Sequence, residues 1–224
     1  MQAAPPVDFF PSRERDVLMV RFGYSAVAVL VGILLSAGCL KLQRPEKPVR
    51  FYTLEYAEPE LRLDKPLGSI LQVNRFGVAP TYNTRRMIYR EGDFRRDAYI
   101  YSQWRDNPGE MVSYFLARDL RGSGYFNAVV PHRTQAGVTH VLEGYVEEFF
   151  EWDFEEGWEA VLTVSITLTK ALEPDVSRKV IRQKTYRVRE PFQEKTPTGL
   201  AAAMSRAMRA LSRQVIEDVY NALR

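Results

Sequence analysis

The stretch at residues 161–170, VLTVSITLTK, alternates strictly between apolar and hydroxyl-bearing side chains. Its even-numbered positions from Leu162 to Leu168 are Leu, Val, Ile and Leu, and its odd-numbered positions from Thr163 onward are Thr or Ser. Successive side chains of a strand point to opposite faces of the sheet. The pattern therefore predicts a strand with one buried face and one face in water.

Two further long strands are predicted on either side of this stretch, at residues 138–150 and 180–189. The connections between the three strands are short and turn-like, around Gly157 and around Pro174 and Asp175. Short connections favour antiparallel neighbours, so we expect these strands to pair antiparallel.

Helical periodicity occurs twice in the chain. Residues 198–223 carry one apolar stripe that is wide enough to lie across a sheet, and residues 111–120 repeat apolar side chains at helical spacing. The second helix has a plausible beginning, with Asn107 as N-cap and Pro108 in the first helical position, and it ends at Gly122.

Shorter strands are expected in the first half of the folded part. They lie at residues 51–56, 70–76, 99–104 and 125–130, with one more short strand before a turn at Gly92. All these elements together predict an α/β (α+β-like) fold. We expect a mainly antiparallel sheet with two principal helices packed on it, in a single domain.

Residues 19–39, MVRFGYSAVAVLVGILLSAGC, have the features of a secretory signal. A basic residue precedes an apolar run, and small residues precede the only cysteine. This end resembles the lipobox of bacterial lipoproteins, with Ser36 where that motif usually has Leu. The resemblance implies cleavage between Gly38 and Cys39 and attachment of diacylglycerol to the Cys39 thiol.

These features divide the chain into a signal peptide at residues 1–38, a lipidated tether at 39–50 and a periplasmic domain at 51–224. Residues 1–18 are acidic as well as basic, unlike the start of a signal, so Met19 is predicted to be the true start. An uncleaved anchor and a core helix are the alternatives. Phe22 to Gly38 is only 17 residues long, and the run lacks a one-sided stripe.

Composition and motifs exclude several functional classes. The net charge of +3 is too small to indicate a nucleic-acid partner. The sequence lacks a nucleophile elbow, a phosphate-binding loop and a zinc-protease motif, so no enzyme activity, cofactor or metal is expected. His132 and His140 are the only histidines, and each is expected to have a loop or strand-edge role.

Two stretches could form a partner surface. Residues 147–159 alternate carboxylates with aromatic side chains, and residues 85–96 are rich in arginine. The first could be a solvated hairpin tip, a partner surface, or a hydrolase site in which two carboxylates act as acid and base. The second could be a solvated loop or a contact for anionic headgroups or an acidic partner. The candidate contact residues are Trp152, Trp158, Arg85, Arg86, Arg95 and Arg96.

Several diffuse motifs follow one another along the mature chain. They are Phe-Tyr-x-Leu at 51–54, an aromatic stretch ending at Trp104, the helix at 111–120 followed by Gly-x-Phe at 124–126, Leu-x-Gly at 142–144, Val-Leu-Thr-Val at 161–164, and an Ala-rich last helix. In this order they resemble the ABC-type transport auxiliary lipoprotein family. That family includes the lipoprotein of the paraquat-inducible intermembrane transport system.

The resemblance implies a non-catalytic periplasmic domain, tethered to the outer membrane by its lipid. It would work with an ABC permease, an ATPase and a mammalian-cell-entry (Mce) domain substrate-binding protein that move lipids or other hydrophobic molecules. Only Cys39 carries over as a site, and Leu40 differs from the Asp that retains lipoproteins in the inner membrane of enteric bacteria. A homo-oligomer stays open, as does an alternative role in stabilising cell-wall or secretion machinery.

Overall fold

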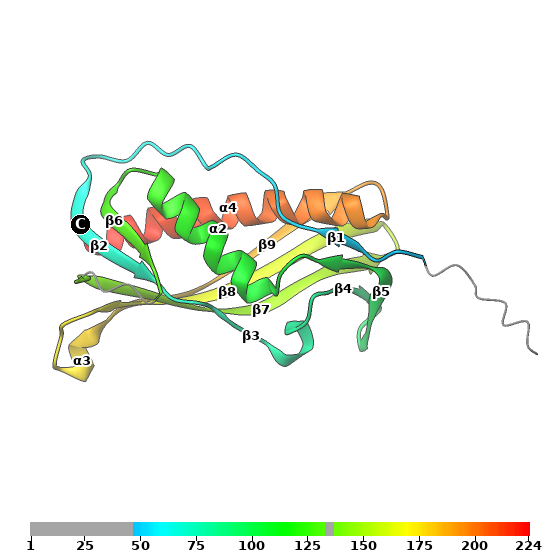
Figure 1. The fold of residues 1–224 in the computed structure, drawn as a ribbon, viewed down its shortest axis with the longest axis horizontal. Coiled ribbons are helices and arrows are strands. Elements are labelled where there is room, and N and C mark those ends of the chain that lie inside the picture. The colour runs from blue at the N-terminus through cyan, green and yellow to red at the C-terminus, as the bar shows by residue number, and fades with distance from the viewer. Residues whose placement is uncertain (1–46, 133–136) are drawn as a thin grey trace, which may run out of the picture. The chain divides into compact units, whose positions relative to one another are not determined.

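Three long strands dominate the computed structural model, which describes residues 47–132 and 137–224 (Figure 1). They are β7 (His140–Phe154), β8 (Gly157–Lys170) and β9 (Val180–Phe192). β7 pairs with β8, and β8 with β9, antiparallel in both cases. The prediction for these three strands is confirmed.

The other edge of β7 is built differently. β2 (Leu67–Val73), β3 (Gly77–Val78) and β4 (Arg86–Glu91) follow one another along it, and all three run parallel to β7. They pair at Leu71–His140, Gly77–Tyr145 and Tyr89–Glu151. One long strand is therefore flanked by three short ones in series.

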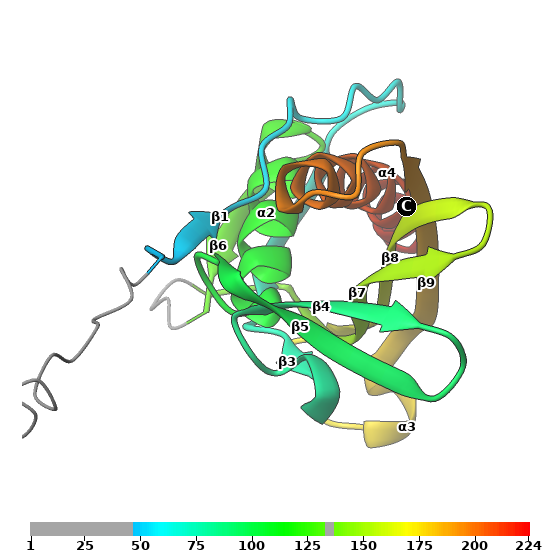
Figure 2. The same ribbon diagram turned by 90° about the vertical axis from the view of Figure 1, so that its right-hand side faces the viewer.

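The outermost strands complete a nine-stranded sheet. β6 (Phe126–Pro131) pairs with β2 in parallel, β5 (Arg95–Trp104) pairs with β4 antiparallel, and β1 (Arg50–Tyr52) pairs with β5 in parallel. Five of the eight strand pairings in the described part are parallel. The prediction of a mainly antiparallel sheet in an α/β (α+β-like) fold is therefore wrong. The protein is mostly β, with a mixed sheet that curls into a half-barrel (Figure 2).

Two long helices, α2 (Pro108–Gly122) and α4 (Pro197–Leu223), lie in the hollow of the curled sheet (Figure 2). Asn107 accepts a hydrogen bond from the Gly109 amide at 3.0 Å, which is the N-cap predicted for α2. Two short elements join strands: the 3₁₀ turn η1 (Pro80–Tyr82) precedes β4, and α3 (Val176–Lys179) precedes β9.

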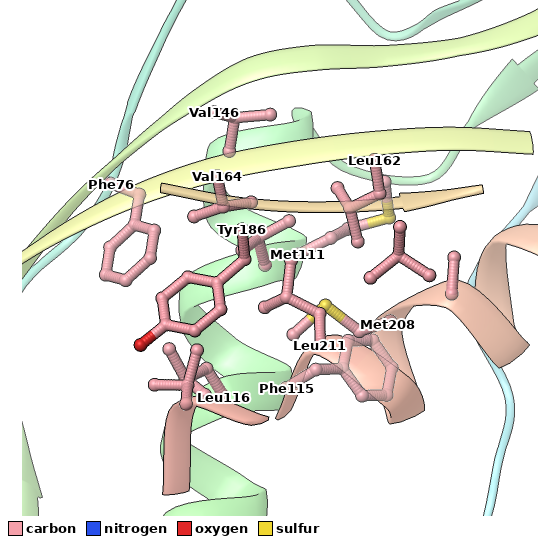
Figure 3. Packing of buried hydrophobic residues seen from close by; sticks show 14 of the residues in the cluster. Phe76, Met111, Phe115, Leu116, Val146, Leu162, Val164, Tyr186, Met208 and Leu211 are labelled. Carbon is pink, nitrogen blue, oxygen red and sulfur yellow. The ribbon is translucent and has the colours of Figure 1, made fainter. Parts of the chain in front are cut away.

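The core lies between the helices and the inner face of the sheet (Figure 3). Leu162 and Val164 of β8 and Met208 and Leu211 of α4 are completely buried. The apolar positions of the opening stretch therefore face the helices, as their spacing predicts. Its outer face is not simply in water, because Thr163 is also buried, 5% exposed, and donates to Glu148 at 2.5 Å.

A coil at residues 53–66 crosses the helices and encloses them from the other side (Figure 1). The Tyr56 hydroxyl donates to the Asp119 carboxylate of α2 at 2.7 Å, and the Arg118 guanidinium donates to the same buried carboxylate at 2.7 and 2.9 Å. The Glu55 amide donates to Ser205 of α4 at 3.0 Å. The predicted strand at 51–56 therefore pairs only as far as residue 52, because the chain then leaves the sheet for the helices.

Within the described residues, no helix has an apolar stretch long enough to cross a bilayer. The predicted start at Met19, the signal peptide and the lipidation site at Gly38 and Cys39 lie outside the described residues. So do most residues of the predicted tether.

Candidate functional site

Two hairpin turns lie at one end of the sheet, next to the loop that leads into α4. The β4–β5 turn is at residues 92–94 and the β7–β8 turn at residues 155–156. We call this region the hairpin end: the two turns, the strand ends that they join, and Lys195. It contains most of the side chains that the sequence singles out as a partner surface.

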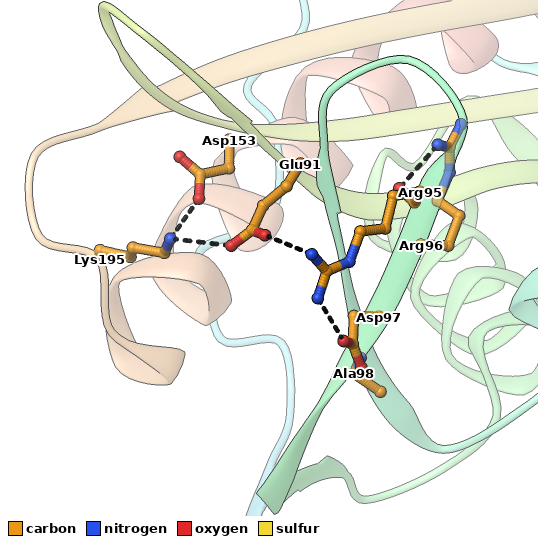
Figure 4. Close-up of polar contacts among 7 residues, drawn as sticks. All are labelled: Glu91, Arg95, Arg96, Asp97, Ala98, Asp153 and Lys195. Atoms are coloured by element: carbon orange, nitrogen blue, oxygen red, sulfur yellow. Dashed lines mark hydrogen bonds and ion pairs between the residues drawn. The ribbon is translucent and has the colours of Figure 1, made fainter.

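Ion pairs connect the three chain segments of the hairpin end (Figure 4). The Lys195 ammonium group contacts Asp153 of β7 and lies 3.8 Å from Glu91 of β4. The Arg95 guanidinium lies 3.8 Å from Glu91 and 3.5 Å from Asp97. The Lys195 ammonium group donates a hydrogen bond to Asp153, and this bond raises the pKa of Lys195. These groups are partly exposed, so each pair contributes little stability, but together they fix the relative positions of both hairpins.

A buried carboxylate lies beneath this network on the inner face of the sheet. Glu151 is completely buried, and the Tyr99 hydroxyl donates to its two carboxylate oxygens at 2.9 and 3.1 Å. The ring of Tyr89 packs edge-on against Tyr99, with 5.3 Å between centroids. Burial raises the pKa of Glu151 to about 7, because the charged form loses its hydration. This carboxyl group therefore titrates near neutral pH.

Stacked cations and aromatic rings lie on the outer face of the same end. The Trp152 ring has the Arg90 guanidinium at 5.0 Å and the Arg189 guanidinium at 4.2 Å from its centroid. Arg96 lies over the Phe150 ring at 5.4 Å. Such contacts are worth about 0.5–2 kcal/mol each, depending on desolvation. They hold a basic and aromatic strip in a fixed arrangement.

The strand register places Glu148 and Glu151 on opposite faces of the sheet. Glu148 is paired with Thr163, and Glu151 with Ala160, and these two β8 positions are an odd number of residues apart. An acid and base pair has to reach one substrate from a common side. The geometry therefore does not support an acid and base pair made of Glu148 and Glu151. In the described part of the chain, no group of His, Cys, Asp and Glu side chains could hold a metal ion.

The structure does not bring all six candidate contact residues together. Trp158 shares a face with its partner Asp153, so it lies on the inner face, whereas Trp152 lies on the outer face. Arg95 and Arg96 lie beside the β4–β5 turn at the hairpin end. Arg85 and Arg86 lie at the far end of β4, where Arg85 is 6.0 Å from the Phe51 ring.

Sequence reasoning misses the buried Glu151 with its Tyr99 hydrogen bonds, and the exposed Lys195 beside it. It groups Glu151 with the solvated carboxylates of residues 147–159. However, Glu151 lies two positions after Phe149, and residues two apart on a strand point to the same face. The signal is hidden by a bulge between Val146 and Glu148, which shifts the alternation of β7 by one residue. Without knowledge of that bulge, the inward-facing positions cannot be counted from Val146.

Comparisons with known proteins bear on both family and fold. The family model described as "ABC-type transport auxiliary lipoprotein component" matches residues 52–216. The solved structure of protein XCC0632 from Xanthomonas campestris, of family DUF330, has a TM-score of 0.70 at 15% identity and covers 78% of this chain and 96% of its own.

A second solved structure, of an uncharacterized protein, has a TM-score of 0.61 at 11% identity and covers 77% of this chain and 99% of its own. At these identities the likeness concerns the fold alone. None of the curated proteins matches the chain in sequence.

Proposed function

Because the chain belongs to the ABC-type transport auxiliary lipoprotein component family, we propose that it is a membrane-anchored, non-catalytic partner of an ABC transporter. The transporter would move lipids or other hydrophobic molecules between the two membranes of the envelope. The observation that carries this proposal is the extent of the match, residues 52–216, which runs from β1 into the last turns of α4. Strands β2 to β9, helix α2 and most of α4 therefore lie within the family domain.

Anchoring in this proposal depends on a lipid at Cys39. The described chain begins at Lys47, whose ammonium group is 5.7 Å from the Tyr101 ring of β5. An extended chain covers at most about 3.5 Å per residue, so residues 39–46 can span about 28 Å. That is short compared with a flexible linker, so the domain would stay close to the membrane surface. Stable anchoring requires more than one acyl chain or an additional contact.

The hairpin end supplies a surface for protein partners in this proposal. Its outer strip presents guanidinium groups stacked on Trp152, and its inner side presents the ion pairs of Lys195. Arg and Trp are enriched in the residues that dominate binding energy at interfaces. The expected partners are the permease, the ATPase and an Mce-domain substrate-binding protein. ATP hydrolysis would take place in the ATPase, and the lipoprotein would be held in the outer membrane.

Affinity purification from the native cell tests this function. A full-length chain with a C-terminal tag would be expressed at its normal level, extracted in mild detergent, and its co-purifying proteins identified by mass spectrometry. The proposal expects the permease, the ATPase and the Mce-domain protein. Recovery of cell-wall or secretion machinery without any ABC component would instead favour the assembly role.

The anchor is tested separately with Cys39→Ala. This variant should lose incorporation of labelled fatty acid and leave the membrane fraction, whereas Leu40→Ala, which keeps the thiol, should behave like the wild type. Fatty acid labelling that survives in Cys39→Ala would contradict the assigned lipid site.

A further inference from the structure

A short ladder attaches the β4–β5 hairpin to the rest of the sheet. In the described part of the chain, β4 pairs with β7 at three positions only, and these are Tyr89–Glu151, Arg90–Trp152 and Glu91–Asp153. β7, in contrast, pairs with β8 along its whole length, from His140 to Phe154. If the contact between β4 and β7 breaks, the hairpin is therefore the part that moves.

The hairpin also has a break in its own ladder. β4 and β5 pair regularly between Glu91–Arg95 and Ile88–Ala98, and the register then shifts before Arg86–Gln103. Such an irregularity disrupts the ladder locally and lets the strand bend. The outer part of the hairpin, residues 88–98, can therefore tilt at this point while β5 stays paired with β1 at residues 102–104.

Glu151, which belongs to the first pair of the β4–β7 ladder, is completely buried. Among the described side chains only the Tyr99 hydroxyl donates to it, at 2.9 and 3.1 Å from its two oxygens. One hydroxyl hydrogen can serve only one of these oxygens at a time. A protonated carboxyl group satisfies both contacts, because its own hydrogen can be donated to the Tyr99 oxygen. The closed arrangement therefore fits the neutral form of Glu151.

The groups around Glu151 do not compensate for its ionisation. The titratable and charged side chains that face it are Tyr89 and Glu91 on β4, Tyr99 on β5, Asp153 on β7 and Lys195 in the loop before α4. Lys195 is the only cation among them, and its ammonium group already contacts Asp153 and lies 3.8 Å from Glu91. An ionised Glu151 would therefore be a buried charge without a partner of its own, which is costly unless water reaches it.

We infer that the outer part of the β4–β5 hairpin, residues 88–98, is a pH-sensitive clamp, which is closed on β7 while Glu151 is protonated and opens when Glu151 loses its proton. A cleft of about 450 Å³ already lies beside the hairpin, and Tyr89, Tyr99 and Lys195 are among its lining residues. Tilting of the hairpin would extend this cleft to the carboxylate and hydrate it.

The direction of the pH effect follows from the burial of Glu151. Burial raises the pKa of Glu151 from 4.5 to about 7 in the closed form. In the open form the carboxylate is hydrated, so its pKa returns to about 4.5. Between these pH values opening releases a proton, so the opening equilibrium constant rises about tenfold per pH unit and about 300-fold in total. Below pH 4.5 and above pH 7 it is constant.

Hydrogen exchange of the full-length protein, followed by mass spectrometry from pH 4.5 to pH 8, tests the clamp. The measured quantity is the protection factor, which compares each observed rate with that of an unstructured chain at the same pH. Residues 88–98 should lose on the order of 100-fold in protection over this range. They should also be less protected than β8 throughout, because the hairpin opens without unfolding of the whole sheet.

Variants show whether Glu151 is responsible. In Glu151→Gln the protection of residues 88–98 should no longer change with pH, and the same is expected for Glu151→Met, which keeps an unbranched side chain in place if the amide is not tolerated. Glu156→Gln in the exposed β7–β8 turn is the matched control and should behave like the wild type.

Three results would overturn the inference. Protection of residues 88–98 equal to that of β8 would mean that the hairpin opens only when the whole domain unfolds. Protection that does not change with pH in the wild type would mean that Glu151 ionises without opening, and a pH dependence that persists in both Glu151 variants would assign it to another group. None of these measurements involves a partner protein. The clamp lies in the hairpin end, so a pH dependence of partner binding there is a consequence that rests on the proposed function.

Discussion

Replacement of Glu151 by Gln should remove a pH dependence from the stability of the protein. The ordinary pKa of this carboxyl group is 4.5, and burial raises it to about 7. Between these pH values Glu151 is ionised in the unfolded chain but protonated in the native protein. The native state therefore binds more protons, and stability falls as pH rises through this interval. At about 1.4 kcal/mol per pH unit, the loss is about 3 kcal/mol above pH 7 and absent below pH 4.5.

The amide introduced by Glu151→Gln cannot ionise, and its carbonyl oxygen can still accept the Tyr99 hydrogen bond. Urea unfolding, followed by tryptophan fluorescence at pH 4.5 and pH 8, gives the free energy of unfolding for wild type and variant. Relative to the wild type, the free energy of unfolding of the variant should be about 3 kcal/mol higher at pH 8 than at pH 4.5. Glu156→Gln in the exposed β7–β8 turn is the control and should show no such change. An equal difference for Glu151→Gln at both pH values would refute the argument from burial.

Three further changes have expected outcomes that unfolding measurements can check. Asp119→Ala leaves the Arg118 guanidinium without its buried carboxylate and should cost about 3 kcal/mol; a loss below about 1 kcal/mol, on the scale of exposed pairs, would contradict this. In Gly144→Ala the new Cβ would lie 2.2 Å from an aromatic ring carbon, so a loss of about 1–3 kcal/mol is expected, whereas Gly137→Ala has open space and serves as control. Trp152→Ala should cost about 1–3 kcal/mol through its two stacked guanidinium groups and its packing, and unchanged stability would show that the stacking is incidental.

The sequence predicts which residues form elements better than it predicts how those elements pair. The alternation of 161–170 and the stripe of 198–223 correspond to β8 and α4 because each reports directly which side chains are buried. The same alternation does not say which strand lies alongside. Short connections identify the antiparallel neighbours of β8, but β2, β3 and β4 reach β7 across a long connection through α2. Extending the antiparallel rule to those strands produces the wrong sheet.

The candidate site was only partly predictable for a related reason. The aromatic and arginine residues are visible as composition, and the structure places many of them at one end. Whether two of them share a face depends on strand register, which separates Trp152 from Trp158. The ion pair of Lys195 with Asp153 joins a strand to a loop that lies 42 residues further along the chain, so no local pattern could reveal it.

The serial arrangement of β2, β3 and β4 along β7 has a consequence for biogenesis. A chain that is synthesised N-terminus first delivers these three strands well before the residues that they must pair with. Non-local pairing cannot begin until the partner segment has emerged, so these three strands cannot join the sheet before residues 140–154 have been synthesised. A product truncated before β7 should therefore be degraded rather than accumulate as a stable fragment.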